Sequence, residues 1–115
     1  MTQQVAAPKR FVQFIASSGS GEPLGFAEAA IRTDYVNGTE TSPVGFLEGI
    51  YVVAESRCQG IAATLVDAVI AWARDAGCRE LASDALLANE LSHRVHRALG
   101  FEETERVVYF RKSIA

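Results

Sequence analysis

Apolar residues in the first half of the chain come in three short runs separated by clusters of turn-forming residues. The runs are FVQFIAS (11–17), LGFAEAAIRTDYV (24–36) and VGFLEGIYVV (44–53), and the intervening SGSGEP and NGTETSP are typical of turns. We expect three strands, the first two forming a hairpin, although the alanines of the second run lower its strand propensity. The third run is almost continuously apolar, as a strand covered on both faces is. Its Gly45 and Gly49 indicate a β-bulge or a close approach by another backbone.

The apolar period then changes to that of a helix. In AATLVDAVIAWARDA (62–76) the apolar side chains gather on one helical stripe, and Gly77 follows as the expected C-cap. RELASDA (79–85) predicts a short strand, NELSHRVHRAL (89–99) a second helix, and RVVYFRKSI (106–114) a final strand. The residues of the two helical stripes are Leu65, Val69, Trp72 and Ala73 in the first helix and Leu91, Val95 and Leu99 in the second.

The predicted order β-β-β-α-β-α-β indicates a mixed sheet with helices on its faces, in the α/β or α+β class. A length of 115 residues fits one domain, 1–115, because the turns recur too regularly to mark a domain boundary. The first ten residues are expected to be flexible.

Composition narrows the classes of protein. With 49% hydrophobic and 22% charged residues the chain is of the globular type. A net charge of -3 argues against nucleic acid as a partner and suits a neutral or cationic small molecule better. Cys58 and Cys78 have neither metal-type nor redox-type spacing, so we expect no metal site and reduced thiols in a cytoplasm. No apolar run could span a bilayer, and MTQQVAAPKR (1–10) lacks the apolar core of a secretion signal.

The segment RCQGIA (57–62) joins the third strand to the first helix. A helix N-terminus presents unpaired N–H groups and the positive end of the helix dipole, and a turn that adds further N–H groups binds anions. Gly60 would let the backbone approach an anion, and Arg57 would add a positive charge. Because the segment matches neither a P-loop nor a G-x-G-x-x-G motif, it predicts a phosphate or pyrophosphate site of another kind. An ordinary turn with a solvent-exposed arginine fits the same spacing.

The same segment resembles the R/Q-x-x-G-x-G/A signature of the GNAT superfamily of N-acetyltransferases. The residues that match it are Arg57, Cys58, Gln59, Gly60, Ile61 and Ala62. NELSHRVHRALGF (89–101) resembles the family's N-x-x-A-x-x-x-Y-x-x-x-G-F helix. More narrowly, DYVNGTETSPVGFLEGIYV, ASDA and SHRVHRALGFEETERVVYF resemble the bacterial aminoglycoside 6′-N-acetyltransferases. The resemblance implies a GNAT-type sheet, mixed and mostly antiparallel, flanked by helices.

It also implies a cofactor and a reaction. The cofactor is acetyl-coenzyme A, whose pyrophosphate the amides of residues 57–62 would bind. The backbone of Ile50 and Val52 would pair with the pantetheine arm, and the N–H near Tyr51 or Val52 would face the thioester carbonyl. The acetyl group would pass to a primary amine by direct attack in a ternary complex. Such a transfer needs a base for the ammonium, a donor for the oxyanion and an acid for the thiolate.

Two carboxylates are candidates on the acceptor side. Glu48 lies among apolar neighbours, where desolvation is expected to raise its pKa toward that of a useful base. The resemblance implies that Glu48 orients the amine and accepts its proton, the alternative being a solvated carboxylate at a strand edge. Asp84 would pair with a cationic amine or act as the base, unless it caps the following turn. Asp34 and Glu40 are either further carboxylates around a polycationic sugar or solvated turn residues.

Three later residues are candidates by the resemblance. Asn89 matches the asparagine that contacts the pantetheine arm, although asparagine is also a common helix cap. His96 stands where many relatives carry a tyrosine that protonates the thiolate, and histidine can serve as that acid. The competing interpretation is that His96 only flanks the helix core. Tyr109 is the alternative acid.

The GNAT fold usually begins with a strand and one or two helices that cover the acceptor site. Only about ten residues precede Phe11, so we expect those elements to be missing and apolar surface to be exposed. The expected assembly is a homodimer. The predicted function is an acetyl-coenzyme A-dependent aminoglycoside 6′-N-acetyltransferase of the cytoplasm. The alternatives are a GNAT enzyme for another small amine or a protein N-terminus, and a truncated module that binds coenzyme A with little activity.

Overall fold

The structure of the protein is a computed structural model that describes residues 2–7, 10–57, 59–85 and 87–115. Cys58, one of the predicted pyrophosphate-loop residues, lies outside the described residues. The chain divides into two compact units, Met1–Asp84 and Ala85–Ala115, which are described separately here.

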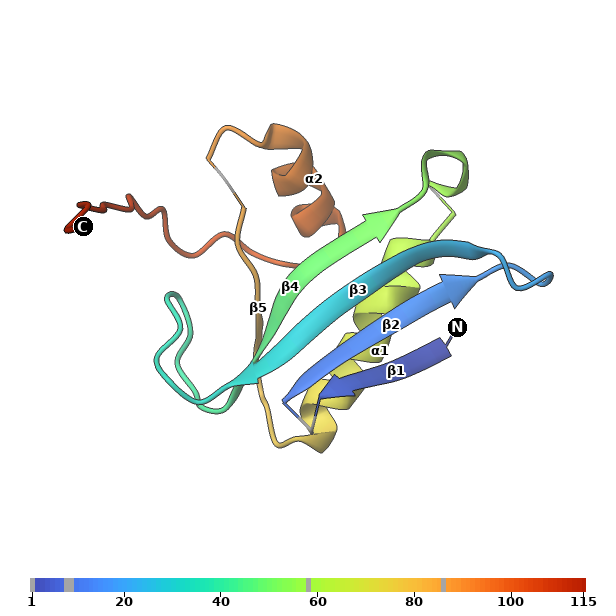
Figure 1. The fold of residues 1–115 in the computed structure, drawn as a ribbon, viewed down its shortest axis with the longest axis horizontal. Coiled ribbons are helices and arrows are strands. Elements are labelled where there is room, and N and C mark those ends of the chain that lie inside the picture. Colours follow the sequence, from blue (N-terminus) through green and yellow to red (C-terminus); the bar gives the residue numbers. More distant parts are fainter. Residues whose placement is uncertain (1, 8–9, 58, 86) are drawn as a thin grey trace. The chain divides into compact units, whose positions relative to one another are not determined.

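The first unit is built on a five-stranded sheet in the order β1-β2-β3-β4-β5 (Figure 1). All neighbouring strands are antiparallel except β4 and β5, which run parallel. The mixed, mostly antiparallel sheet is therefore confirmed. The strands are β1 Thr2–Ala7, β2 Phe11–Ser17, β3 Pro23–Arg32, β4 Val44–Val52 and β5 Leu81–Ala82.

Strand β1 lies within the first ten residues, where the sequence predicted no strand. The segment Thr2–Ala7 pairs with β2 in an antiparallel register in which Thr2 lies opposite Ile15. Its own sequence, TQQVAA, begins with three polar residues and has β-branched residues only at Thr2 and Val5. A strand of this kind forms because the exposed edge of a neighbouring strand offers it backbone hydrogen bonds, and that edge is not visible in the local pattern.

Helix α1 (Ile61–Asp75) covers one face of the sheet (Figure 1). Its buried residues face β2, β3 and β4. A Cβ built on Gly45 would lie 3.0 Å from the Cβ of Ala73, which is tight for two such atoms. The tight neighbour of Gly45 is thus a helix side chain, whereas the sequence predicted a close approach by another backbone. The core on this face is formed by Val12, Phe14, Ala27, Ala29, Leu47, Leu65, Val66, Val69 and Ala73.

A β-bulge interrupts the pairing of β3 with β4. Glu28 lies opposite Gly49 and Ala29 lies opposite Leu47, which leaves Glu48 as the extra residue of β4. The bulge indicated by the glycines of this strand is therefore confirmed, and it falls at the predicted base.

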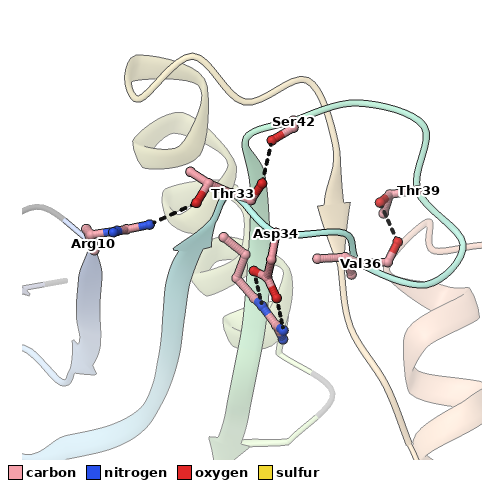
Figure 2. Close-up of polar contacts among 7 residues, drawn as sticks. Arg10, Thr33, Asp34, Val36, Thr39 and Ser42 are labelled. Atoms are coloured by element: carbon pink, nitrogen blue, oxygen red, sulfur yellow. Dashed lines mark hydrogen bonds and ion pairs between the residues drawn. The ribbon is translucent and has the colours of Figure 1, made fainter.

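The connection from β3 to β4 is tied to the sheet by polar side chains (Figure 2). Arg10 Nη2 donates to Thr33 Oγ1 over 3.2 Å, and Ser42 Oγ donates to the Thr33 carbonyl oxygen over 3.1 Å. Thr39 Oγ1 donates to the carbonyl oxygen of Val36 over 2.6 Å. Val36 itself is buried, so this loop is fixed by packing as well as by hydrogen bonds.

The second unit contains one helix, α2 (Glu90–Ala98), within its described residues. The final strand predicted at 106–114 is wrong, because residues 101–115 form neither helix nor strand. The described part of this unit offers no other strand with which that segment could pair, and a lone strand is not stable in water.

Over the described part of the chain, no helix is both long and apolar enough to cross a membrane.

Candidate functional site

Strand β4 is paired along its whole length on one side only. On the β3 side the register continues to Val52, which lies opposite Gly25. On the β5 side it ends at Phe46 opposite Ala82, and Ser83 Oγ donates a long hydrogen bond of 3.5 Å to the Leu47 carbonyl oxygen. Among the described residues of the first unit, no strand pairs with this side of β4 beyond Phe46. The predicted cofactor-binding stretch Ile50, Tyr51 and Val52 therefore has a backbone edge that suits an extended ligand.

Close packing on the other side holds that stretch in place. A Cβ built on Gly25 would lie only 2.5 Å from the Tyr51 carbonyl oxygen and 3.1 Å from the Val52 Cα atom. The main-chain N–H of Val53 donates to the carbonyl oxygen of Leu24 over 2.8 Å. Glycine at position 25 is what lets the ends of β3 and β4 approach this closely.

Strand β4 leads into a single 3-10 turn, η1 (Ala54–Ser56), and then into α1. Gly60 is the N-cap of α1 and has the left-handed conformation, with φ 78° and ψ 7°. The first turn of the helix has no acidic residue. Among the described residues, which exclude Cys58, no side chain caps the helix and a Cβ at Gly60 would meet no atom within 4 Å. The N–H groups at the start of α1 have no partner within the helix, so open space lies before a positive helix end. This arrangement fits an anionic group such as a pyrophosphate.

Arg57 folds back onto the end of β4. Its Nε donates to the Val52 carbonyl oxygen over 2.9 Å, and its guanidinium lies 5.6 Å from the ring centre of Tyr51. The Tyr51 ring in turn lies 6.1 Å from the ring of Phe26. Gln59 Nε2 spans the turn and donates to the Glu55 carbonyl oxygen over 3.4 Å. The positive charge of Arg57 therefore lies beside the free edge of β4.

Glu48 does not have the environment that its apolar neighbours predicted. As the extra residue of the bulge it is exposed, whereas Phe46 and Leu47 before it are buried. The expected desolvation of its carboxylate is wrong, because Glu48 is exposed as the extra residue of the bulge. Glu48 nevertheless lies in β4, one residue before Gly49, next to the free edge of that strand.

Asp84 follows β5 and is exposed. No helix starts after it before α2, whose N-cap is Asn89, so the described structure gives Asp84 no helix to cap. Glu48 and Asp84 share an electrostatic neighbour, since both help to raise the pKa of Arg32. The larger causes of that shift are the hydrogen bond and the charge of Asp34. The guanidinium of Arg32 lies 5.2 Å from the ring centre of Phe46, which is two residues before Glu48 and is paired with Ala82, two residues before Asp84. The hydrophobic pattern did not single out Arg32.

The other predicted residues lie in the second unit. Asn89 caps α2, its Oδ1 accepting from the Ser92 N–H over 3.1 Å. His96 Nδ1 lies 2.7 Å from the Ser92 carbonyl oxygen. Because a carbonyl oxygen only accepts, Nδ1 carries the proton in this contact. Tyr109 is 78% exposed and lies in irregular chain, so the strand expected to carry it is absent.

Comparison with known proteins decides the family. A family model described as Acetyltransferase (GNAT) family matches residues 3–101. This chain belongs to the GNAT acetyltransferases. The segment 57–62, the free edge of β4 and the start of α1 are accordingly the regions in which a GNAT cofactor site is expected.

Individual relatives are more specific. The chain is 57% identical over 111 residues to "Aminoglycoside N(6')-acetyltransferase type 1" of Stenotrophomonas maltophilia, covering 96% of this chain and 72% of the relative. It is 51% identical over 112 residues to the protein of the same name from Acinetobacter baumannii, covering 97% and 77%.

Solved structures agree with these relatives. The structure of AAC(6')-Iy in complex with a bisubstrate analog, CoA-S-monomethyl-acetylneamine, matches with a TM-score of 0.86 and 52% identity, over 90% of this chain and 70% of that one. AAC(6')-Ih from Acinetobacter baumannii matches with a TM-score of 0.89 and 53% identity, over 92% and 72%. The GNAT fold of the chain is therefore confirmed.

Proposed function

We propose that this GNAT chain transfers the acetyl group of acetyl-coenzyme A to the 6′-amine of aminoglycoside antibiotics, and so confers resistance to them. The observation that carries the proposal is the free edge of β4, which runs directly into an open, positively polarised helix start. The relatives at 51–57% identity are aminoglycoside 6′-acetyltransferases, which supports this acceptor over other amines.

The cofactor would be held by backbone groups. When bound, acetyl-coenzyme A supplies the acetyl group as an activated thioester. The backbone of Ile50, Tyr51 and Val52 would bind the pantetheine arm and the thioester oxygen, and the N–H groups of residues 57–62 would bind the pyrophosphate. Gly60 supports this because its left-handed conformation orients the turn without a side chain. The Oδ1 of Asn89 already caps α2, so its amide NH₂ group is what we propose for contact with the pantetheine arm.

The acceptor would be bound and activated by carboxylates. Glu48, exposed at the bulge, would orient the amine and accept its proton, directly or through a water molecule. Asp84 would pair with a second ammonium group or replace Glu48 as the base. Carboxylates suit this task because an aminoglycoside is polycationic and charge-assisted hydrogen bonds to carboxylates are the stronger kind.

The departing thiolate would take its proton from His96 or, alternatively, from Tyr109. Since His96 Nδ1 donates to the Ser92 carbonyl oxygen, the ring would have to be the doubly protonated imidazolium, which would give its Nε2 proton to the thiolate and become neutral. A His96→Phe variant with unaltered turnover would remove His96 from the reaction.

The deciding experiment measures acetyl-coenzyme A turnover with kanamycin and tobramycin, beside calorimetry of coenzyme A binding. Turnover with binding supports the proposal, and turnover with other amines alone would indicate a different GNAT acceptor. Binding without any turnover would leave a coenzyme A-binding module. Glu48→Gln should reduce the rate constant and Asp84→Asn should mainly raise the KM for the drug. Glu22→Gln, in the turn between β2 and β3, is the matched control.

We further propose a cytoplasmic homodimer that does not bind nucleic acid. Half-buried apolar side chains on the sheet face opposite α1, such as Phe11, Ile15 and Phe26, favour association. Cys78 is a buried free thiol, which suits a reducing compartment. A sedimentation measurement that finds a stable monomer at micromolar concentration would contradict the dimer.

A further inference from the structure

Arg32 ends β3 on the sheet face that α1 does not cover. The register pairs Arg32 with Val44 and Ala30 with Phe46, and residues paired across antiparallel strands share a face. Gly45, whose neighbour is Ala73 of α1, lies on the opposite face. Arg32 and Phe46 therefore lie away from α1.

Two contacts hold the Arg32 side chain. Its Nη2 lies 3.1 Å from Asp34 Oδ2 and its Nε lies 3.5 Å from Asp34 Oδ1, so the two carboxylate oxygens contact two nitrogens of the guanidinium. Its guanidinium carbon lies 5.2 Å from the ring centre of Phe46, in a cation–π contact. The side chain of Arg32 is 38% exposed and that of Asp34 is 69% exposed.

The acceptor-side carboxylates follow the residues beside which the guanidinium lies. Glu48 is two residues after Phe46 in β4, and Asp84 is two residues after Ala82, which is paired with Phe46. Glu48 and Asp84 both help to raise the pKa of Arg32, after the larger effects of Asp34. Yet among the described residues the only ion pair of Arg32 within 4.0 Å is the one with Asp34. By this placement Arg32 lies near Glu48 and Asp84, but its ion pair is with Asp34.

From this arrangement we infer that Asp34 is a positioning residue, which holds the guanidinium of Arg32 away from Glu48 and Asp84 and so keeps both carboxylates available to the ammonium groups of the acceptor. The inference rests on the proposed function. An arginine released from Asp34 would pair with the nearest carboxylates. It would then compete with the drug, because the guanidinium and the drug's ammonium groups bind the same carboxylate oxygens. Asp34 would therefore bind the Arg32 guanidinium, while Glu48 and Asp84 bind the ammonium groups of the aminoglycoside.

The test is a double-mutant cycle with Asp34→Asn and Arg32→Gln, read as the Kd of tobramycin by calorimetry and as its KM. Asp34→Asn alone should raise the drug Kd about two- to fivefold, the size expected when one exposed ion pair is lost. In the Arg32→Gln background the same substitution should change the Kd much less, because no cation remains to be released. The KM for acetyl-coenzyme A should stay unchanged, and Asp34→Glu should restore drug affinity.

A matched control separates this effect from net charge and from loop anchoring. Arg10→Gln removes one positive charge and the hydrogen bond to Thr33 of the same loop, and it should leave the coupling between Arg32 and Asp34 intact.

The outcomes separate the inference from its alternatives. If Asp34→Asn raises the drug Kd equally in the wild-type and Arg32→Gln backgrounds, the inference is overturned, because the effect then comes only from the lost negative charge. Coupling that appears only in thermal stability would also overturn it, since the pair would then be structural. If the wild type binds tobramycin with the predicted coupling but does not acetylate it, the proposed function fails and this inference stands. If no variant binds tobramycin, both fail.

Discussion

The main-chain N–H of Phe101 donates to the carbonyl oxygen of His96 over 3.0 Å, and the two rings meet edge to face with centroids 5.2 Å apart. This is a Schellman ending of α2, in which Gly100 has φ 91° and its N–H donates to the Arg97 carbonyl oxygen. The glycine and the aromatic residue after α2 thus fix the orientation of the His96 ring. Gly100 and Phe101, which the sequence analysis matched to the end of the GNAT helix motif, therefore also terminate α2 and contact His96.

Replacing Phe101 with alanine should loosen His96. The edge-to-face contact would be lost, at a cost of about 0.5–1.5 kcal/mol to the stability of the α2 ending. The ring resonances of His96 in NMR spectra should broaden or shift, and acetyl transfer should slow if His96 is the acid. Phe110→Ala is the control, because Phe110 is 91% exposed. Unchanged His96 resonances in Phe101→Ala would show that the contact does not order the ring.

A methyl group at position 25 should separate the ends of β3 and β4. Gly25→Ala would place its Cβ 2.5 Å from the Tyr51 carbonyl oxygen, which is backbone and cannot rotate away. We expect a loss of about 1–3 kcal/mol in the free energy of unfolding, as for overpacked sites. Coenzyme A affinity should fall as well, because Tyr51 lies on the proposed cofactor edge. Gly19→Ala, where an added Cβ meets nothing within 4 Å, should leave urea denaturation and calorimetry unchanged.

The strands and helices that carry a strong periodic pattern could be predicted from the sequence. Strand β2 has the predicted bounds, 11–17, because every second residue is buried under α1. Helix α1 begins at Ile61, one residue before the helix predicted at 62–76, and Gly77 has the positive φ expected after a helix end. These features depend on residues close together in the chain.

The failures depend on partners that lie far apart in the chain. Strand β1 forms on the edge of β2, whereas the apolar segment at 106–114 has no partner strand among the described residues of its own unit. Glu48 is the exposed extra residue of a bulge, which is defined only by the pairing of β4 with β3. The pairing of Arg32 with Asp34 is local in sequence, but its proximity to Glu48 and Asp84 arises only when β3, β4 and β5 come together.

The left-handed conformation of Gly60 gives a prediction that separates backbone strain from steric blocking. Gly60→Ala should destabilise the fold by about 1–2 kcal/mol, because alanine disfavours φ 78°. Asparagine tolerates this conformation better, so Gly60→Asn should regain much of that stability. If a side chain at this position obstructs a bound pyrophosphate, both variants should bind coenzyme A more weakly than the wild type. Recovery of coenzyme A binding in Gly60→Asn would show that backbone conformation alone matters.

Glu80 should make the stability of the first unit depend on pH. Its carboxylate accepts from the Thr41 hydroxyl and from the main-chain N–H groups of Glu40 and Thr41, at 2.9 and 2.8 Å for the latter two. The Thr41 hydroxyl is the largest cause of the lowered pKa of Glu80, and the backbone donors add to it. These bonds attach the connection between β3 and β4 to the segment before β5.

A carboxyl group with a lowered pKa in the folded state stabilises the fold above its unfolded pKa, and this contribution is lost as the pH falls through the folded value. For Glu80 the loss should begin as the pH falls below about 4.5, its ordinary value. Glu80→Gln should therefore lower the urea midpoint at neutral pH, and its difference from the wild type should shrink below that pH. Glu40→Gln is the control, because it removes a carboxylate from the same loop while its main-chain N–H still donates to Glu80. A constant difference between Glu80→Gln and the wild type across this range would mean that the amide loses shape complementarity and that charge plays no part.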